Sequence, residues 1–364
     1  MLKIREQLSR LYMSSALGDL SLTGAWVAIL AARGYSLVEI GIVETVFHIT
    51  SLIFEIPSGV LADVFGRKRM LIVSSIMRMI GNIVMILSNN LFMVSLSLAF
   101  YALSYNFSSG TGDALAYDSL KFAKMEAGFE KYMSNQLTIH RICGGISTLC
   151  AGFALFIGYK MAYGTSLIAN TFQIIILLSL HEMYGADLQK GKENKIIRRL
   201  FTCFTESIIF LKEVKKIMGV MLCNSFVGAI DVLLLFFLQA KLLERGIPEW
   251  SLGAALFFME MGGVVGSRLI LRFSKFSYKG VFVITLSLVL SGVLAEHSPW
   301  YGIMVLGGFL AAIGDDALQV RTNVILQDTF PSEQRATLTS LESFTFSIIM
   351  IVLSPFAGFV FMYW

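Results

Sequence analysis

The sequence predicts an all-α membrane protein, and three features of its composition support this fold class. Hydrophobic residues occupy 56% of the 364 positions and charged residues only 15%, and the mean hydropathy is +0.72. A soluble globular chain is about 25% charged, so a water-facing fold could not bury this much apolar surface. The chain contains only 5 prolines, which favours long continuous helices.

Eleven stretches are long and apolar enough to cross a bilayer, because a spanning helix needs about 20 mainly apolar residues. They cover residues 11–32, 37–61, 69–88, 91–119, 134–158, 162–182, 216–241, 250–271, 279–296, 299–325 and 333–361. The connections on one side are very short, such as 34–36 and 89–90, whereas those on the other side are longer and basic. The expected protein is therefore multi-pass.

The distribution of cations predicts the orientation of these spans. If the N-terminus and the links after even-numbered spans face inward, those segments hold 21 of the 29 Lys and Arg residues, and the opposite links hold 4. Cytoplasmic loops carry such an excess of cations. We therefore expect a protein of the cell (inner, cytoplasmic) membrane with a cytoplasmic N-terminus. The net charge of +4 is spread over short loops near an anionic leaflet, so the expected partner is the lipid bilayer and not nucleic acid.

One long polar linker divides the chain. Residues 1–188 would form an N-terminal bundle of six helices and residues 214–364 a C-terminal bundle, with 189–213 as a cytoplasmic linker. Within the linker, 200–213 is either an amphipathic helix on the membrane surface or a solvated loop. The two halves look like repeats, because Asp19 and Asp231, and Gly41 and Gly253, share an offset of 212 residues.

A specific motif connects the second and third spans. It reads Gly59-x-x-x-Asp63-x-x-Gly66-Arg67-Lys68-Arg69, and Phe-Glu-Ile-Pro-Ser precedes it. Gly66 can take a positive φ without strain at Cβ, which permits a tight hairpin with cations at its tip. The motif resembles the loop between helices 2 and 3 of the major facilitator superfamily (MFS) of transporters. Gly-Asp-Ala-Leu-Ala-Tyr-Asp at 112–118 supports this resemblance.

The resemblance implies the MFS fold, with two pseudo-symmetric six-helix bundles related by an axis normal to the membrane. Eleven spans leave five helices for the second bundle, so the chain is expected to lack the twelfth helix. The implied subtype is similar to drug/proton antiporters. Two of their usual signatures are altered here. Many family members have an Arg ahead of Gln-Gly-x-Gly in the fourth helix, and Asn106 and Ser109 occupy those places in this chain; the Gly-x-x-x-Gly-Pro of the fifth helix has no proline.

Ionisable residues inside apolar spans are the candidate functional groups, because each costs about 2.5–3.5 kcal/mol on membrane-insertion scales. Asp19 and Asp231 lie in the first and seventh spans, which line the central cavity in the resembled family. A partly desolvated carboxylate there could exchange protons or bind a cationic substrate. The alternative is a hydrogen bond or ion pair that only holds the helices together.

The second span carries three titratable residues, Glu44, His48 and Glu55, at steps of four and seven. This spacing puts them on one helix face and suggests a proton path. The alternative is that Glu55 forms a structural ion pair with Arg78 or Arg141.

The fourth span offers Asp113 and Asp118, which we expect within reach of His140 and Arg141 on the fifth span. The small residues that begin at Gly110 should allow another helix to approach closely.

A second polar set occurs in the later half of the chain, with Arg321 expected to neutralise an aspartate of the tenth span. Gly262-x-x-x-Gly266 suits close helix packing. The carboxylates of this set are Glu260, Asp315, Asp316 and Glu342.

The resemblance implies that the loop motif is a cytoplasmic gate. Asp63 would face the positive N-terminal end of the eleventh helix near Pro331 and Ser332, and Arg67 would support it through nearby carboxylates. The alternative is a loop that only sets topology.

No enzyme signature, cofactor motif or metal-like cysteine spacing is evident, and none is expected. We predict a monomeric secondary transporter that exports a small amphipathic molecule by alternating access in exchange for protons, a multidrug-type efflux activity. Two alternatives stay open. One is a nutrient symporter or uniporter of the same fold. The other is a non-transporting membrane sensor or assembly partner.

Overall fold

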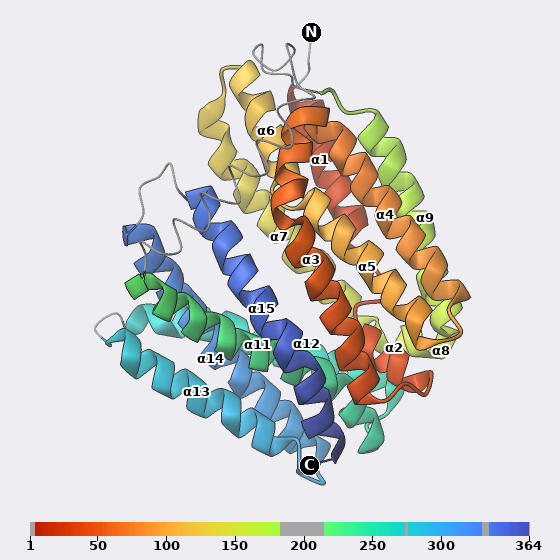
Figure 1. Ribbon diagram of the computed structural model, residues 1–364, viewed down its shortest axis with the longest axis vertical. Coiled ribbons are helices and arrows are strands. Elements are labelled where there is room, and N and C mark those ends of the chain that lie inside the picture. Colours follow the sequence, from red (N-terminus) through yellow and green to blue (C-terminus); the bar gives the residue numbers. More distant parts are fainter. Residues whose placement is uncertain (1–3, 183–214, 274–275, 330–334, 364) are drawn as a thin grey trace. The chain divides into compact units, whose positions relative to one another are not determined.

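A computed structural model describes residues 4–182, 215–273, 276–329 and 335–363, and these residues form helices and connecting turns without strands (Figure 1). This confirms the predicted all-α fold class. The possible surface helix at 200–213 lies outside the described residues. The helices are α1 (Ile4–Asp19), α2 (Trp26–Ala32), α3 (Leu37–Phe65), α4 (Arg67–Leu87), α5 (Leu91–Ser108), α6 (Thr111–Phe122), η1 (Glu126–Gly128), α7 (Phe129–Leu149), α8 (Ala151–Ile157), α9 (Tyr159–Leu178), α11 (Lys215–Glu244), α12 (Glu249–Arg272), α13 (Tyr278–Ala295), α14 (Tyr301–Thr329) and α15 (Arg335–Tyr363).

Nine helical segments among the described residues are long and apolar enough to span a membrane. A tenth span results if α7 and α8, which meet at an angle of 49°, are counted together. The first expected span, residues 11–32, is instead divided into α1 and α2 by a non-helical stretch. Of the eleven expected spans, nine thus each match one of these nine helical segments, and the other two, 11–32 and 134–158, are each divided between two helices.

The described residues fall into two compact units. The first unit lies within Met1–Gly24, Val46–Ser147 and Ile157–Glu206. An apolar cluster joins α1, α6, α7, α9 and the residues just after α9, with Leu11, Leu115, Tyr132, Leu177 and Leu180 all at most 3% exposed. This cluster fixes α1 beside α9 and so positions the polar residues at the end of α1.

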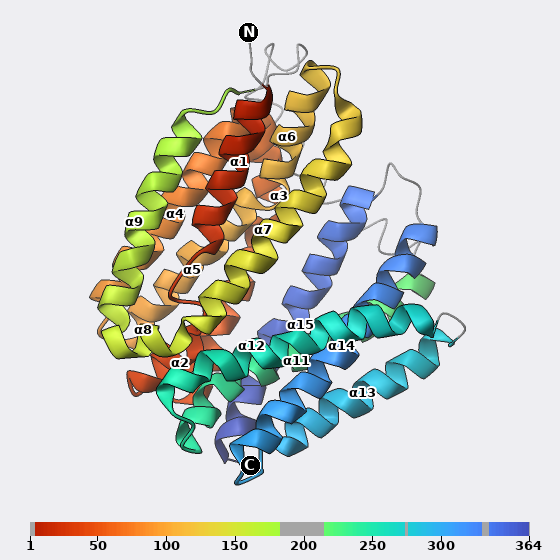
Figure 2. The same ribbon diagram turned by 180° about the vertical axis from the view of Figure 1, so that it is seen from behind.

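The second unit lies within Ala25–Thr45, Thr148–Phe156 and Ser207–Trp364. In it α14 packs against both α12 and α13, and the three helices lie together in both views (Figures 1 and 2). A Cβ atom added at Gly262 or Gly266 would come within 2.2 or 2.0 Å of a carbonyl oxygen of α14. The predicted role of this glycine pair in close packing is confirmed.

Two further helix crossings inside the second unit join early and late parts of the chain through glycine. A Cβ at Gly41 would lie 2.4 Å from the Ser354 carbonyl oxygen of α15, and one at Gly358 would lie 2.4 Å from the Leu37 oxygen of α3. The crossing of α8 and α12 is built in the same way.

At that second crossing, a Cβ at Gly152 would lie 2.1 Å from the Glu249 oxygen, and one at Gly253 would lie 2.2 Å from the Leu149 oxygen. Each crossing thus has a glycine on both helices, which lets the two backbones touch.

Pro355 lies inside α15 and leaves the carbonyl group four residues earlier without its helical donor. The hydroxyl group of Thr45 donates to that carbonyl, at Ile351, over 3.3 Å. A side chain of α3 therefore satisfies the backbone where proline interrupts α15, as an apolar surrounding requires.

Candidate functional site

The first polar centre lies where α1 ends and the chain continues without helical structure to α2. The Ser21 amide donates to the Ser147 hydroxyl oxygen over 2.9 Å, and that hydroxyl donates to the Asp19 carbonyl oxygen over 3.1 Å. The Ser21 hydroxyl also contacts the hydroxyl groups of Thr23 and Ser166, at 2.5 and 3.2 Å. Hydroxyl side chains thus replace the missing helical hydrogen bonds at this break.

The carboxylate of Asp19 faces His140 of α7, with 3.2 Å between Asp19 Oδ2 and His140 Nδ1. Arg78 of α4 donates to the Gly18 carbonyl oxygen over 2.6 Å and brings a cation to the same place. Asp113 and Asp118 were expected within reach of His140 and Arg141, but the carboxylate that contacts His140 is that of Asp19. Asp19, His140 and Arg78 are therefore brought together.

The loop motif forms a network with α6 and α9 inside the first unit. Gly66 has φ +101°, as its predicted turn requires. The Arg67 side chain pairs with the carboxylate of Asp118 and donates to the Ala114 carbonyl oxygen over 2.6 Å. Lys68 donates to the Leu178 carbonyl oxygen over 2.7 Å. Arg67 therefore has a nearby carboxylate, as expected, but its part in a gate stays a prediction. The helix N-terminus expected to face Asp63, near Pro331 and Ser332, lies outside the described residues.

The motif has a further partner, Glu182, whose role no sequence pattern indicates. Its carboxylate accepts from the backbone amides of Arg67 at 3.0 Å and Arg69 at 3.4 Å, the first residues of α4. A carboxylate at a helix N-terminus satisfies free amides and complements the helix dipole. Glu182 follows an apolar span directly, and only the fold reveals its role.

Replacing Glu182 with alanine is expected to loosen the first turn of α4, because it removes both acceptors from free amide groups. A capping interaction is worth about 1 kcal/mol, so local opening should increase about fivefold. Trypsin cleavage after Arg67, Lys68 or Arg69 in open membranes should accelerate by that factor. Glu126→Ala, which removes an exposed carboxylate of η1, is the control and should leave the cleavage rate unchanged.

The titratable residues of α3 differ in burial. Glu44 and His48 are 7% and 6% exposed, and Glu55 is half-buried. Arg78 donates to the Gly18 carbonyl group, and no ion pair joins Glu55 to a cation of the described residues. The interpretation of Glu55 as half of a structural ion pair with Arg78 or Arg141 gains no support, and the proton path stays a prediction.

A second polar centre lies inside the second unit, between α11, α12 and α14. Asp231 of α11 is 4% exposed, and its Oδ1 atom makes no hydrogen bond within the described residues. It interacts electrostatically with Asp315 and Asp316 of α14. Three carboxylates are thus gathered in an apolar helix bundle.

Two glycines make room for these carboxylates. A Cβ at Gly263 of α12 would lie 2.1 Å from Asp316 Oδ2, and one at Gly228 of α11 would lie 3.3 Å from Asp315 Oδ1. The expected neutralising cation, Arg321, instead donates to the Phe273 carbonyl oxygen over 2.8 Å.

The remaining candidates are dispersed. Glu260 of α12 accepts from the Thr148 hydroxyl group over 3.0 Å, and Glu342 is a half-buried residue of α15. Asp113 lies in the first turn of α6. The expected close approach at Gly110 is wrong, because nothing lies within 4 Å of an added Cβ; its φ of +67° shows that glycine is needed there for the turn between α5 and α6.

These features define a multi-pass helical membrane protein with buried polar centres inside its bundles. Residues 9–294 match the sequence pattern of the Major Facilitator Superfamily, and the chain belongs to this family. It is an MFS transporter. A relative from Bacillus subtilis (strain 168), an uncharacterized MFS-type transporter named YxaM, is 24% identical over 355 residues, which cover 92% of this chain and 84% of the relative.

Solved structures support the same fold. The nucleoside transporter NupG is similar with a TM-score of 0.71 and 16% identity, covering 99% of this chain and 91% of that chain. The peptide transporter POT, in complex with sulfate, gives a TM-score of 0.71 at 14% identity, covering 98% and 90%. A D-xylose–proton symporter gives 0.66 at 12% identity, covering 97% and 88%. These similarities establish the fold.

Proposed function

We propose that this MFS transporter exports a small amphipathic molecule across the cytoplasmic membrane in exchange for protons, acting as a monomer of the drug/proton antiporter type. In this proposal residues 1–188 and 214–364 are the two halves, and the N-terminus is cytoplasmic. The proposed direction of transport and the proposed substrate class are based on the sequence. It contains 29 Phe and 18 Met, which favour apolar, adaptable binding surfaces.

Proton coupling is inferred from the group of three carboxylates formed by Asp231, Asp315 and Asp316. An isolated carboxylate charge is costly in an apolar interior unless a cation neutralises it. Asp231 is almost completely buried, and its Oδ1 atom accepts no hydrogen bond within the described residues. The group is therefore suited to bind and release a cation, and the proton is the cation that carboxylates exchange directly.

The break after α1 supports a substrate-binding role for the first polar centre. Transporter sites are typically formed where a spanning helix is discontinuous and its polar backbone is available. Here the break presents the Asp19 carboxylate, the His140 imidazole and several hydroxyl groups. This combination can bind a molecule with a cationic or hydrogen-bonding head, while neighbouring apolar side chains contact its remaining part.

Proteoliposomes containing the purified chain provide the test. Amphipathic cations, found first through a drug-sensitivity panel in an efflux-deficient host, should release protons from preloaded vesicles only when protein is present. A sodium gradient of equal size serves as the control and should not drive uptake. Substrate movement that ignores the proton gradient, or proton movement in the substrate's own direction, would contradict antiport and favour a uniporter or a nutrient symporter. Absence of any solute movement would favour the sensor alternative.

A further inference from the structure

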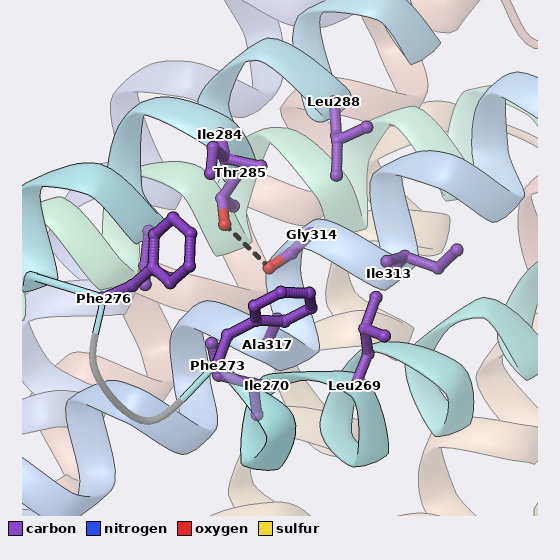
Figure 3. Close-up of a pocket in the computed structure, with 11 residues that line it drawn as sticks. Leu269, Ile270, Phe273, Phe276, Ile284, Thr285, Leu288, Ile313, Gly314 and Ala317 are labelled. Atoms are coloured by element: carbon purple, nitrogen blue, oxygen red, sulfur yellow. Dashed lines mark hydrogen bonds between the residues drawn. The ribbon is translucent and has the colours of Figure 1, made fainter.

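A separate apolar pocket lies between α12, α13 and α14, and none of its lining residues is a carboxylate. Its volume is ≈ 290 Å³. Figure 3 shows the side chains of the three helices around this space. Its one hydroxyl-bearing residue, Thr285, donates to the Gly314 carbonyl oxygen over 3.0 Å (Figure 3). The pocket therefore offers no free polar side chain and suits a hydrocarbon chain. The lining includes Leu269, Phe273, Phe276, Ile284, Leu288 and Ala317.

Cations border one end of this pocket. Arg272 follows Leu269 by one turn of α12, and Arg321 follows Ala317 by one turn of α14, so each shares a helix face with a lining residue. Arg321 donates to the Phe273 carbonyl oxygen, while its Nε atom is buried and makes no hydrogen bond within the described residues. A donor is thus available beside the pocket.

The charged residues that α12 and α13 contribute near the pocket are of one sign, whereas Asp315 and Asp316 of α14 approach Gly228 and Gly263. Arg268, Arg272 and Lys279 are exposed, and none forms an ion pair with a carboxylate of the described residues. The sequence from 261 to 295 contains no Asp or Glu at all. The site therefore combines an apolar pocket with unneutralised cations, which complements a molecule with a hydrocarbon chain and an anionic head.

We infer that this pocket binds an anionic phospholipid of the bilayer, with one acyl chain between α12, α13 and α14 and the phosphate beside Arg272 and Arg321. The predicted orientation places this end on the cytoplasmic side, where anionic lipids are enriched and basic pockets between helices bind their head groups. The inference is independent of the transported substrate, because it uses none of the carboxylates proposed for coupling.

The test measures lipid binding to the full-length purified protein by native mass spectrometry. After delipidation, the protein is titrated with phosphatidylglycerol or with phosphatidylcholine of identical acyl chains. Each cation near the surface contributes roughly a fivefold gain for an anionic head. Wild-type protein should therefore bind phosphatidylglycerol at least fivefold more tightly, and R272Q should lose about fivefold of that affinity without changing the binding of phosphatidylcholine.

Two controls make the result specific. Lys121→Gln removes an exposed cation of α6 in the first unit and should have no effect. A317F fills the pocket and should weaken binding of both lipids, whereas V283F, at a 60% exposed position of α13 outside the lining, should not. Equal affinity of wild-type protein for the two lipids, or full phosphatidylglycerol affinity in R272Q, would overturn the inference. Because R272Q changes an exposed side chain, its result stands even if A317F fails to fold.

Discussion

Replacing Gly152 with leucine is expected to disrupt the crossing of α8 and α12. A Cβ at this position would lie 2.1 Å from the Glu249 carbonyl oxygen, and backbone atoms cannot move aside as a flexible side chain can. Overpacking of this kind costs about 1–3 kcal/mol, which increases the open population of the crossing roughly 5- to 150-fold. If alternating access requires these helices to separate, the same variant should favour the separated state.

Cys150, two residues before Gly152, is a native reporter for this effect. In a background with Cys143, Cys203 and Cys223 replaced by alanine, its maleimide labelling in membranes should accelerate by the same factor. Gly144→Leu is the matched control, since nothing lies within 4 Å of an added Cβ there. Unchanged labelling in folded Gly152→Leu protein would show that the crossing tolerates a side chain and would remove its proposed importance.

The sequence patterns that have a single physical explanation gave the most reliable predictions. Long apolar runs give spanning helices because an unsatisfied backbone is too costly in lipid, and most expected spans match observed helices. The repeat-related pair Gly41 and Gly253 marks close crossings, where an added Cβ would lie 2.4 and 2.2 Å from a carbonyl oxygen. Their offset of 212 residues indicated only that the two halves are repeats.

Features that depend on tertiary partners could not be predicted. The break between α1 and α2 lies in the apolar run 11–32 and is stabilised by the hydroxyl groups of Ser147 and Ser166, more than a hundred residues away. The partner of His140 likewise depends on which carboxylate the fold brings near, and periodicity contains no information about distances between helices. The role of Glu182 could not be predicted, because its carboxylate accepts hydrogen bonds from backbone amides and such contacts leave no signature in the sequence.

Replacing Asp231 with asparagine is expected to abolish proton-driven transport while leaving the protein folded. Asparagine has nearly the same shape but cannot exchange a proton, and it removes a charge from the group that Asp231 forms with Asp315 and Asp316. Substrate-dependent proton movement should fall to the level of empty liposomes. Thermal stability in detergent should be equal or higher, because an isolated buried carboxylate is costly.

Two comparisons separate loss of coupling from general damage. Glu244→Gln, at a 58% exposed position of the same helix, should transport normally. Gly263→Ala keeps all three carboxylates but displaces the flexible end of Asp316, since an added Cβ would lie 2.1 Å from Oδ2; Gly302→Ala, in open space, is its control. Gly263→Ala should therefore impair proton coupling with little loss of stability. Normal proton movement in folded Asp231→Asn protein would show that this group has no part in coupling. The proton would then have to be exchanged elsewhere, and Asp19 and His140 would be the next residues to replace.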